Sequence, residues 1–549
     1  MTKALALRLQ KVLPNIIHPD QVGYIPGRYI GENIRILKDL MIYTAAMKIP
    51  GYIVLVDFEK AFDSIEWDFL FKTLKAFNFG PKFISWIRIL YTDISSYVGN
   101  NGYYSNYFKL TRGIRQGCPI SALLFLLVAE ILAINLRHDT KIHGLHLCST
   151  TFKVKMLADD TTLLLKDIKS IEIAIKKFQD FSKCSGLNLN LKKTEVIPIG
   201  TATLAEKNKS ILLQKINVKK GPYKTLGIWF SNNQNEMARL NFEERLVNIK
   251  NMLYIWSSRV LSLKGKITVL KTLILPKILF LFSIVYVPDE MLKTIDNLFF
   301  NFLWNKKPPK IKKNTITGMI KDGGLKMVDV HKMHTAAKCI WIKRLLNDSK
   351  GNWKILFVKM LSINEHMLNK NLPSSESNKC LSNFHKQVLD SWLTVKYTHP
   401  EKIEEILNQY ILYNRNIKTG NKYITLEKFT NKFSWNVKII DILDNNGNIL
   451  KRNILNAKLE SNLSLMFYNS LVSSIPQSWR NTIKNSSEIS NSSRGPNEVC
   501  LKSVPTSKMI YESLIEKDFK TPVAITSWID LFPSFLRKSQ MDIHILFTI

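Results

Sequence analysis

The segment from Phe152 to Leu165 (FKVKMLADDTTLLL) constrains the fold more than any other part of this sequence. Two apolar runs flank a short polar centre, which predicts a β-hairpin with Asp159 and Asp160 at its turn. Two adjacent acids repel each other, and a hairpin turn has no structural need for both. A bound cation would explain the pair, while a solvated Asp-Asp turn is the alternative that this segment alone leaves open.

A third acid stands at the end of another predicted strand. Gly51–Phe58 (GYIVLVDF) is a short β-branched run typical of a buried strand, and Asp57 lies where that strand ends. Taken alone, such an acid is often a helix cap or a loop residue. If Asp57, Asp159 and Asp160 converge on one face of a sheet, however, three carboxylates can hold two Mg²⁺ ions about 3.5–4 Å apart for phosphoryl transfer. Mg²⁺ favours carboxylates combined with substrate phosphates and water.

The charge balance indicates the kind of partner. The 549 residues include 78 Lys and Arg but 44 Asp and Glu, which gives a net charge of +34. Such an excess favours a polyanionic partner, nucleic acid first and an anionic membrane surface second. The apolar stretches Ser121–Leu136 and Ile278–Val287 are predicted to be buried helices, so we expect no membrane association.

The cysteines indicate a protein of a reducing, intracellular compartment. The spacing of apolar residues predicts a second part of the chain that is mostly helical. The six cysteines form no CxxC, which excludes a disulfide framework and an ordinary zinc finger and favours a reducing compartment, nucleus or cytoplasm. Helical spacing recurs along the chain in several segments: Asp68–Phe77, Lys82–Tyr91, Ile120–Leu136, Ile171–Ser185 and most of Glu236–Trp304. Leu372–Lys379 and Asn481–Asn497 are rich in Asn and Ser and are predicted to be linkers.

At this point five motifs, in order along the chain, become recognisable. They are DQVGYIPGR (20–28), DFEKAFD (57–63), RQGCPISALLF (115–125), LADD (157–160) and GLNLNLKKTEV (186–196). Together they resemble the reverse transcriptase of non-long-terminal-repeat, LINE-type retrotransposons. The resemblance covers roughly residues 5–345. It implies an α+β, right-hand polymerase of fingers, palm and thumb with an antiparallel palm sheet, followed by a mostly helical basic region.

The resemblance also implies a division of the chain into four parts. Residues 1–200 would form fingers and palm, 201–235 a primer-grip hairpin region, 236–350 a basic helical thumb and connector, and 351–549 a region of unknown role with Asn- and Ser-rich linkers. The family's first finger segment and upstream endonuclease are not seen, so the resemblance implies an N-terminally truncated fragment. Two positions depart from the family pattern, since Leu157 and Thr225 stand where an aromatic residue is usual.

Carried over by motif, the acids and nearby aromatic residues acquire expected roles. Asp57 would be the first metal ligand, Asp159 the second and Asp160 the companion acid, with two Mg²⁺ ions as cofactors and Mn²⁺ as a substitute. Phe62 would be a steric gate that clashes with a 2′-hydroxyl and so selects deoxynucleotides. Phe58 belongs to the same expected substrate-binding set. Without the motif, Phe62 would be interpreted as a core residue.

Polar residues of the other motifs would contact template, primer or nucleotide. Gln116 and Gly117 resemble the pair beside the nascent base pair, where glycine permits close backbone approach. Arg115 would contact phosphate or template, and Arg28 would pair with the triphosphate. Lys193 is a candidate general acid for the leaving pyrophosphate.

Alternatives remain for both the general acid and the function. Lys192 is a rival to Lys193, and either lysine could be an ordinary surface residue. The expected function is an RNA-directed DNA polymerase acting on an RNA template, a DNA primer and deoxynucleoside triphosphates, and no protein partner can be inferred. The alternative is a catalytically inactive, nucleic-acid-binding remnant of such an element.

Overall fold

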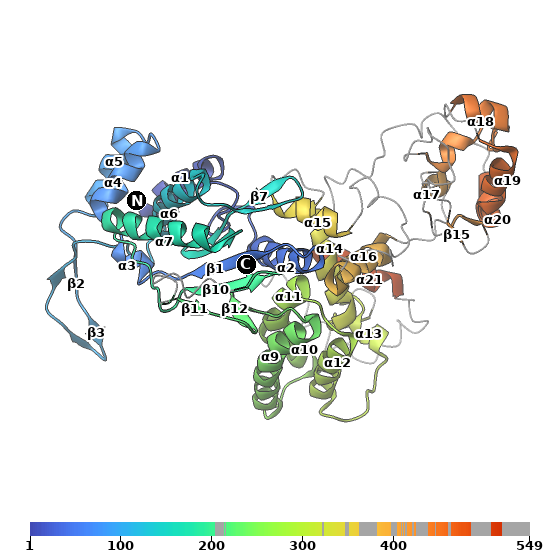
Figure 1. The fold of residues 1–549 in the computed structure, drawn as a ribbon. Coiled ribbons are helices and arrows are strands. Elements are labelled where there is room, and N and C mark those ends of the chain that lie inside the picture. The colour runs from blue at the N-terminus through green and yellow to red at the C-terminus, as the bar shows by residue number, and fades with distance from the viewer. Residues whose placement is uncertain are drawn as a thin grey trace. The chain divides into compact units, whose positions relative to one another are not determined.

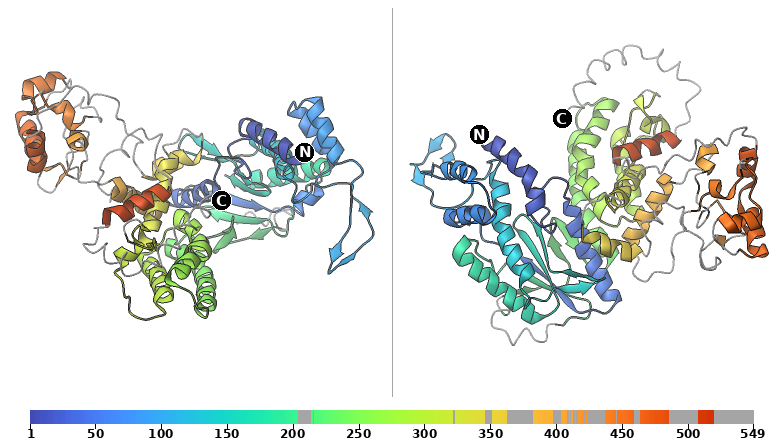
Figure 2. Two further views of the ribbon diagram at one scale, coloured as in Figure 1. Left: turned by 180° about the vertical axis from the view of Figure 1, so that it is seen from behind. Right: turned by 90° about the horizontal axis from the view of Figure 1, so that it is seen from above.

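A computed structural model describes most of the chain as two compact units (Figures 1 and 2). One unit comprises Met1–Met237 with Lys350–Leu361, and the other comprises Ala238–Ser349 with Ser362–Ile549. The described residues are 1–203, 214, 216–320, 323–345, 351–361, 382–396, 437–458 except 445, 463–484, 507–518 and short stretches between 403 and 423. The four-part division expected from the motifs stays a prediction.

A five-stranded sheet forms the centre of the first unit, with strand order β11-β10-β1-β9-β8. Its strands are β1 (Gly51–Val56), β8 (Val154–Leu157), β9 (Asp160–Leu165), β10 (Glu195–Ile199) and β11 (Asn217–Val218). Neighbouring strands are antiparallel except β10 and β11, which are parallel. The predicted hairpin is therefore present, although it begins at Val154, because Phe152 belongs to the preceding ribbon of β6 (Leu145–Leu147) and β7 (Thr150–Phe152).

Both faces of this sheet are covered. Tyr52 and Val54 join the core that contains the apolar residues of α6 (Ser121–His138) and α7 (Ile168–Ser185). Ile53 points to the opposite face, because successive strand side chains alternate, and it is also fully buried. α2 (Ile30–Ala46) contacts β8 and β10. The prediction of an α+β fold with a largely antiparallel sheet is confirmed.

The remaining elements of the first unit are short helices and two-stranded ribbons. The helices are α1 (Thr2–Ile16), α3 (Ala61–Ser64), α4 (Trp67–Ala76), α5 (Pro81–Leu90) and α15 (Trp353–Leu361). The ribbon strands are β2 (Ser95–Ser96), β3 (Gly99–Asn100), β4 (Tyr103–Tyr104), β5 (Phe108–Lys109), β12 (Tyr223–Thr225) and β13 (Ile228–Phe230). The helices predicted around α4, α5, α6 and α7 are thus present, and α7 ends at Gly186, whose φ of +80° suits glycine.

The described part of the second unit is mostly helical. Its helices are α9 (Gln234–Ser257, which starts in the first unit), α10 (Leu263–Val269), η2 (Leu270–Ile274), α11 (Leu275–Ile284), α12 (Asp289–Trp304), α13 (Lys313–Thr317), α14 (Val330–Leu345), α16 (Asn383–Lys396) and α21 (Ser507–Asp518). The buried Lys266 side chain donates to the carbonyls of Phe302 and Leu303, at 3.0 and 3.2 Å, and so ties α10 to α12. The prediction of an almost wholly helical Glu236–Trp304 is confirmed.

A separate apolar cluster organises the described residues between 403 and 484. Its elements are α17 (Ile403–Leu407), β14 (Lys418–Thr419), β15 (Lys422–Tyr423), η6 (Ile439–Ile442), α18 (Arg452–Lys458), α19 (Leu465–Ser474) and α20 (Gln477–Lys484). One linker prediction is partly wrong, because Asn481–Lys484 continue α20, whose Trp479 and Ile483 are buried. The other predicted linker, Leu372–Lys379, lies outside the described residues.

Two helical runs in the described chain are long and apolar enough to cross a membrane by length and composition alone. They are Ser121–His138, with 67% of its apolar window buried, and Leu263–Ile284, with 56% buried. The second run is longer than the sequence suggested, because α10, η2 and α11 follow one another without a break. Burial of this extent is what core helices of a folded domain show, and α6 packs directly on β8.

Candidate active site

Three acids lie at one end of the central sheet. β1 pairs with β9 so that Val56 is opposite Thr161, which puts Asp57 and Asp160 next to each other just beyond that pair. Asp159 precedes Asp160 in the tight turn between β8 and β9, where Leu157 is paired with Asp160. The sheet register therefore brings together the acids that the sequence singled out.

The electrostatics of this cluster fit a cation. The Asp160 residue is exposed at the start of β9, yet partial loss of solvation, then the neighbouring carboxylates of Asp159 and Asp57, raise its pKa above the ordinary value. Among the described residues, no ion pair includes any of the three acids. The same residues contain no ready-made cage of three or more His, Cys, Asp or Glu side chains.

A single glutamine holds the turn that carries Asp159 and Asp160. The side-chain nitrogen of Gln21 donates to the Ala158 carbonyl at 3.1 Å, while its oxygen accepts from the Ala158 and Gly23 amides at 2.8 and 2.9 Å. Ala158 has a φ of +55°, an uncommon conformation for a residue with a Cβ. Gly23 is required beside it, because a Cβ there would lie 2.7 Å from the Ala158 nitrogen. Gln21 thus fixes the backbone immediately before the acids.

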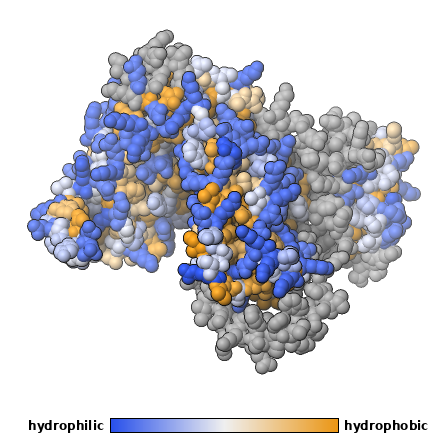
Figure 3. Space-filling view, turned by 90° about the horizontal axis from the view of Figure 1, so that it is seen from below, coloured by the Kyte–Doolittle hydropathy of each residue, from blue (hydrophilic) through white to orange (hydrophobic). Residues whose placement is uncertain are grey.

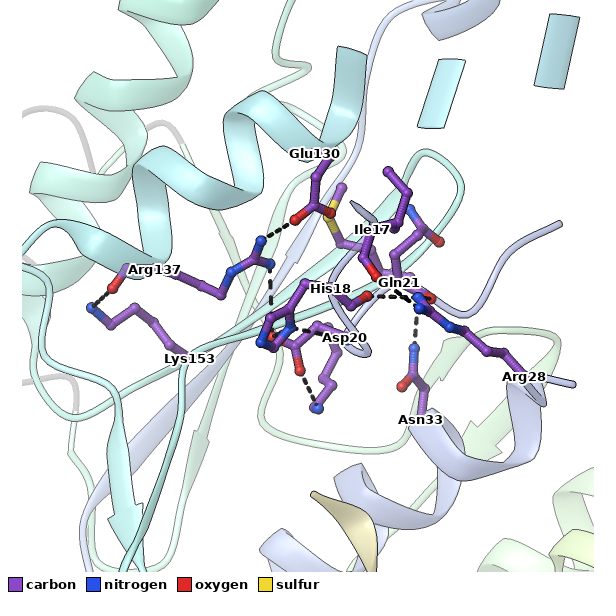
Figure 4. Close-up of polar contacts among 11 residues, drawn as sticks. Ile17, His18, Asp20, Gln21, Arg28, Asn33, Glu130, Arg137 and Lys153 are labelled. Atoms are coloured by element: carbon purple, nitrogen blue, oxygen red, sulfur yellow. Dashed lines mark hydrogen bonds and ion pairs between the residues drawn. The ribbon is translucent and has the colours of Figure 1, made fainter. Parts of the chain in front are cut away.

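The chain around Gln21 also extends the sheet. The Val22 amide donates to the Met156 carbonyl and the Met156 amide donates to the Asp20 carbonyl, both at 3.0 Å, so this segment runs parallel to β8. Asn33, from α2, donates to the same Met156 carbonyl at 2.9 Å (Figure 4). The hairpin strand β8 is therefore held on its outer edge as well as by β9.

A buried ionic layer lies behind this edge (Figure 4). Asp20 accepts from Lys155 of β8 at 2.5 Å and pairs with His18 at 3.0 Å, while Arg137 lies 3.8 Å away and also pairs with Glu130. Burial alone would raise the pKa of Asp20, but Lys155 and His18 hold it well below its ordinary value. Burial raises the pKa of Glu130, against the opposing effect of Arg137. Lys155 and Arg137 thus supply positive charge to this layer, while Glu130 Oε2 and Arg137 Nη1 are buried without a hydrogen-bond partner.

Arg28 lies in this structural layer. Its guanidinium donates to the carbonyls of His18, Gln21 and Ile17, each at 2.7 Å, and to that of Pro14 at 3.3 Å (Figure 4). These bonds tie the end of α1 to the segment that clamps the turn. The structure thus gives Arg28 a positioning role in the loop, and the expected contact with the triphosphate stays a prediction.

The aromatic residues of the DFEKAFD motif pack on core helices. The Phe62 ring stacks on Phe125 of α6 with centroids 4.5 Å apart, and the Phe58 ring is 5.8 Å from Phe178 of α7. Both side chains are only partly buried, so an exposed edge remains at each. The stacking on Phe125 restricts the Phe62 ring, and its role as a steric gate stays a prediction.

The RQG motif comes to the same neighbourhood. The Ile114 amide donates to the Phe62 carbonyl at 2.7 Å, and Gln116 donates to the Asp63 carboxylate at 3.3 Å. Gly117 has a φ of +83° and open space where a side chain would stand. Arg115 is exposed. The predicted substrate contacts of Arg115, Gln116 and Gly117 stay predictions, but their proximity to the DFEKAFD segment is an observation.

Lys193 lies in the loop whose Asn190 is bonded to the backbone of Asp57. The Asn190 amide donates to the Asp57 carbonyl at 2.9 Å, and the Lys193 amide bonds back to Asn190. Lys192 and Lys193 are both exposed, so the choice between them as general acid is not decided by burial.

Sequence reasoning missed the residues that hold the acids in place. Gln21 was part of a recognised motif but had no assigned task, and neither Asn33 nor Lys155 was singled out. A lysine between Val154 and Met156 in an apolar strand was the available clue, because a lysine at a buried strand position needs an acidic partner.

Acids at the ends of adjacent antiparallel strands in a strongly basic chain are compatible with a nucleic-acid polymerase core. The comparisons make this specific, because residues 1–230 match the family described as reverse transcriptase (RNA-dependent DNA polymerase). The chain carries a reverse transcriptase domain, and its relatives are proteins of non-long-terminal-repeat retrotransposons, which confirms the LINE-type resemblance.

Two relatives and one solved structure illustrate the extent of the similarity. The 149 kDa protein of transposon TX1 from Xenopus laevis is 26% identical over 433 residues, which cover 76% of this chain and 33% of that protein. The Pol polyprotein of the type-2 retrotransposable element R2DM from Drosophila melanogaster is 26% identical over 33% of this chain and 17% of its own length. Apo telomerase from Candida tropicalis matches 70% of this chain and 55% of its own, with a TM-score of 0.33 and 10% identity. The chain thus spans a third or less of these two retrotransposon proteins.

Proposed function

We propose that this chain is an RNA-directed DNA polymerase that adds deoxynucleotides to a primer 3′-hydroxyl along an RNA template. The observation that carries the proposal is the adjacency of Asp57 and Asp160 across β1 and β9, with Asp159 in the turn, inside the segment that matches reverse transcriptases. The net charge of +34 supports binding of a phosphate backbone. Hydrophilic side chains cover much of the face drawn in Figure 3.

Reverse transcriptases use divalent metal ions, and the acids of this site have the chemistry to hold them. When bound, two Mg²⁺ ions, or Mn²⁺ in their place, would lower the pKa of the primer hydroxyl and neutralise the leaving pyrophosphate. Asp57 and Asp159 would be the ligands, with Asp160 beside them. The chain's own contribution is positioning, because the β1–β9 register fixes Asp57 and the Gln21 clamp fixes the turn. Phe62 would lie under the incoming sugar.

Primer extension on poly(A)–oligo(dT) with thymidine triphosphate and Mg²⁺ tests the proposal. We expect extension by the native chain, none by Asp159→Asn, and normal extension by Asp68→Asn, which removes an exposed acid of α4 outside the site. A folded native chain that binds the primer–template but extends nothing would contradict the proposal. That result would instead indicate a catalytically inactive nucleic-acid-binding remnant.

A further inference from the structure

Residues 95–109 form a narrow ribbon that projects from the rest of the first unit (Figures 1 and 2). β2 pairs with β5 near its base and β3 with β4 near its tip, and both pairs are antiparallel. Asn101 and Gly102 close the tip with φ values of +48° and +84°, a pattern typical of a tight hairpin turn. A two-stranded ribbon has no core of its own, so its side chains face solvent on both sides.

This ribbon carries strongly exposed aromatic residues. The side chains of Tyr103, Tyr104 and Tyr107 are 81%, 71% and 72% exposed. Tyr97 makes edge contacts with Tyr104 and Tyr107, with ring centroids 5.3 and 5.1 Å apart, which groups three rings on the ribbon. A single exposed aromatic side chain is ordinary, but a group of them on one projecting element indicates a binding surface.

The charge around the ribbon favours one kind of occupant. Residues 94–129 contain Lys109, Arg112 and Arg115 and no acidic residue. Arg112 lies 3.6 Å from the carboxylate of Glu66, and this pair is exposed on both sides. An aromatic surface beside the positive charge of Lys109 matches a polyanion that also carries flat apolar groups.

The base of the ribbon is attached beside the candidate active site. The Gly113 amide donates to the Ile65 carbonyl at 2.8 Å, and the Trp67 indole donates to the Gly113 carbonyl at 2.8 Å. Ile114 follows and bonds to Phe62, five residues after Asp57. The ribbon is therefore fixed to the segment that carries the first acid.

We propose that this ribbon is a binding site for single-stranded nucleic acid, with bases stacked on Tyr97, Tyr103, Tyr104 and Tyr107 and phosphates near Lys109. The proposal deepens the proposed polymerase function, on which it rests, by adding a grip on the strand outside the catalytic end of the sheet. Every base has an aromatic face, so the site tolerates any sequence.

The test measures binding of fluorescein-labelled 20-mers, oligo(U) RNA and oligo(dT) DNA, to the full chain by anisotropy, without nucleotide or metal. Replacing Tyr103, Tyr104 and Tyr107 together by Ala should raise Kd by about a hundredfold or more, since each stacked base contributes about 5- to 150-fold. The matched Tyr→Phe triple variant keeps the rings and should bind as the native chain does. The slope of log Kd against log salt should be unchanged in both variants, because neither removes a charge. Lys109→Ala should make that slope shallower by about 0.7, the contribution of one phosphate contact on a single strand.

Several results would overturn the proposal. An unchanged Kd in the Ala variant would exclude stacking and would leave the ribbon as a surface for a protein partner. A Phe variant as weak as the Ala variant would assign the effect to hydroxyl groups or to folding. Should the Ala triple variant melt early, the single Tyr103→Ala variant provides the same comparison at the most exposed ring. Because the assay contains no nucleotide, a native chain that binds but does not extend primers fails the polymerase proposal alone.

Discussion

The β8–β9 hairpin connects two groups of carboxylates that the protein treats in opposite ways. At its turn, Asp159 and Asp160 lie beside Asp57, and the pKa of Asp160 is raised by lost solvation and by its acidic neighbours. Behind its outer strand, Asp20 is paired with Lys155, and its pKa is held well below the ordinary value despite burial. Among the described residues, Asp57, Asp159 and Asp160 form no ion pair, whereas Asp20 is paired with Lys155.

This difference separates acids that build the fold from acids that serve a ligand. A buried carboxylate and its cationic partner are both needed for the stability of the fold, because removing the partner leaves an uncompensated buried charge. Clustered carboxylates without a cationic partner repel one another and oppose folding, and a bound cation would remove that repulsion. Gln21 stands between the two groups, since its backbone follows Asp20 and its side chain holds Ala158.

The largest effect is expected from neutralising the unpaired group. Asp57→Asn should reduce primer extension by about a thousandfold or more, since a catalytic metal supplies several kcal/mol of transition-state stabilisation. Its melting temperature should equal or exceed that of the native chain, because a repulsive charge is removed. Extension rates and thermal melts of both proteins provide the check. A clear drop in melting temperature would mean that Asp57 belongs to the structural group and would break the comparison.

The next effect concerns the paired group. Lys155→Met should destabilise the first unit by about 3–5 kcal/mol, because Asp20 would remain buried without its main partner. Urea denaturation measures this loss, and Asp20→Asn combined with Lys155→Met should recover much of it. Lys183→Met is the control, since Lys183 forms an exposed pair with Asp180 and exposed pairs contribute little to stability. Equal losses in the two lysine variants would contradict the distinction.

Much of the fold around the site could be predicted because its causes are local. The apolar runs on both sides of Asp159 and Asp160 specify a hairpin, and the Gly80-Pro81 break separates α4 from α5 as the sequence indicated. Asp57 was correctly placed at a strand end, because six residues of β1 before it are apolar or glycine. These features depend on residues next to one another in the chain.

The supporting layer could not be predicted, because its partners are distant in sequence. Lys155 and Asp20 are 135 positions apart, and Gln21 and Ala158 are 137 apart. Nothing local in a motif says whether Arg28 binds phosphate or backbone carbonyls, since both are acceptors for the same guanidinium donors. The chain path decides this, and it brings four carbonyls to Arg28 before any ligand arrives.

An intermediate effect is expected where the two groups meet. Gln21→Leu leaves the Ala158 amide and carbonyl unpaired, which should cost about 1–3 kcal/mol and allow the turn to move. A displacement of about 1 Å can reduce a rate about a hundredfold. The rate of primer extension should therefore fall by more than the loss of folding free energy alone would explain. Asn33→Leu is the matched control, because it removes one bond to Met156, two residues before the turn. If both variants lose primer extension to a similar extent, Gln21 has no particular role in positioning the acids and contributes only to the stability of the fold.

The smallest effect tests the opposite pKa directions directly. A carboxylate whose pKa is raised on folding weakens the fold above that pKa, and the penalty disappears as pH falls through it. Asp160→Asn should therefore raise stability at pH 7 by no more than about 1 kcal/mol, with the gain vanishing toward pH ~4. Asp20→Asn should show the reverse sign, because a lowered pKa stabilises the fold above the ordinary value near 3.9 and that contribution is lost in acid. Melting temperatures of both variants and of the native chain between pH 3 and 8 measure these stability changes. If both variants change the melting temperature with the same sign and the same pH dependence, the two acids do not have opposite pKa shifts.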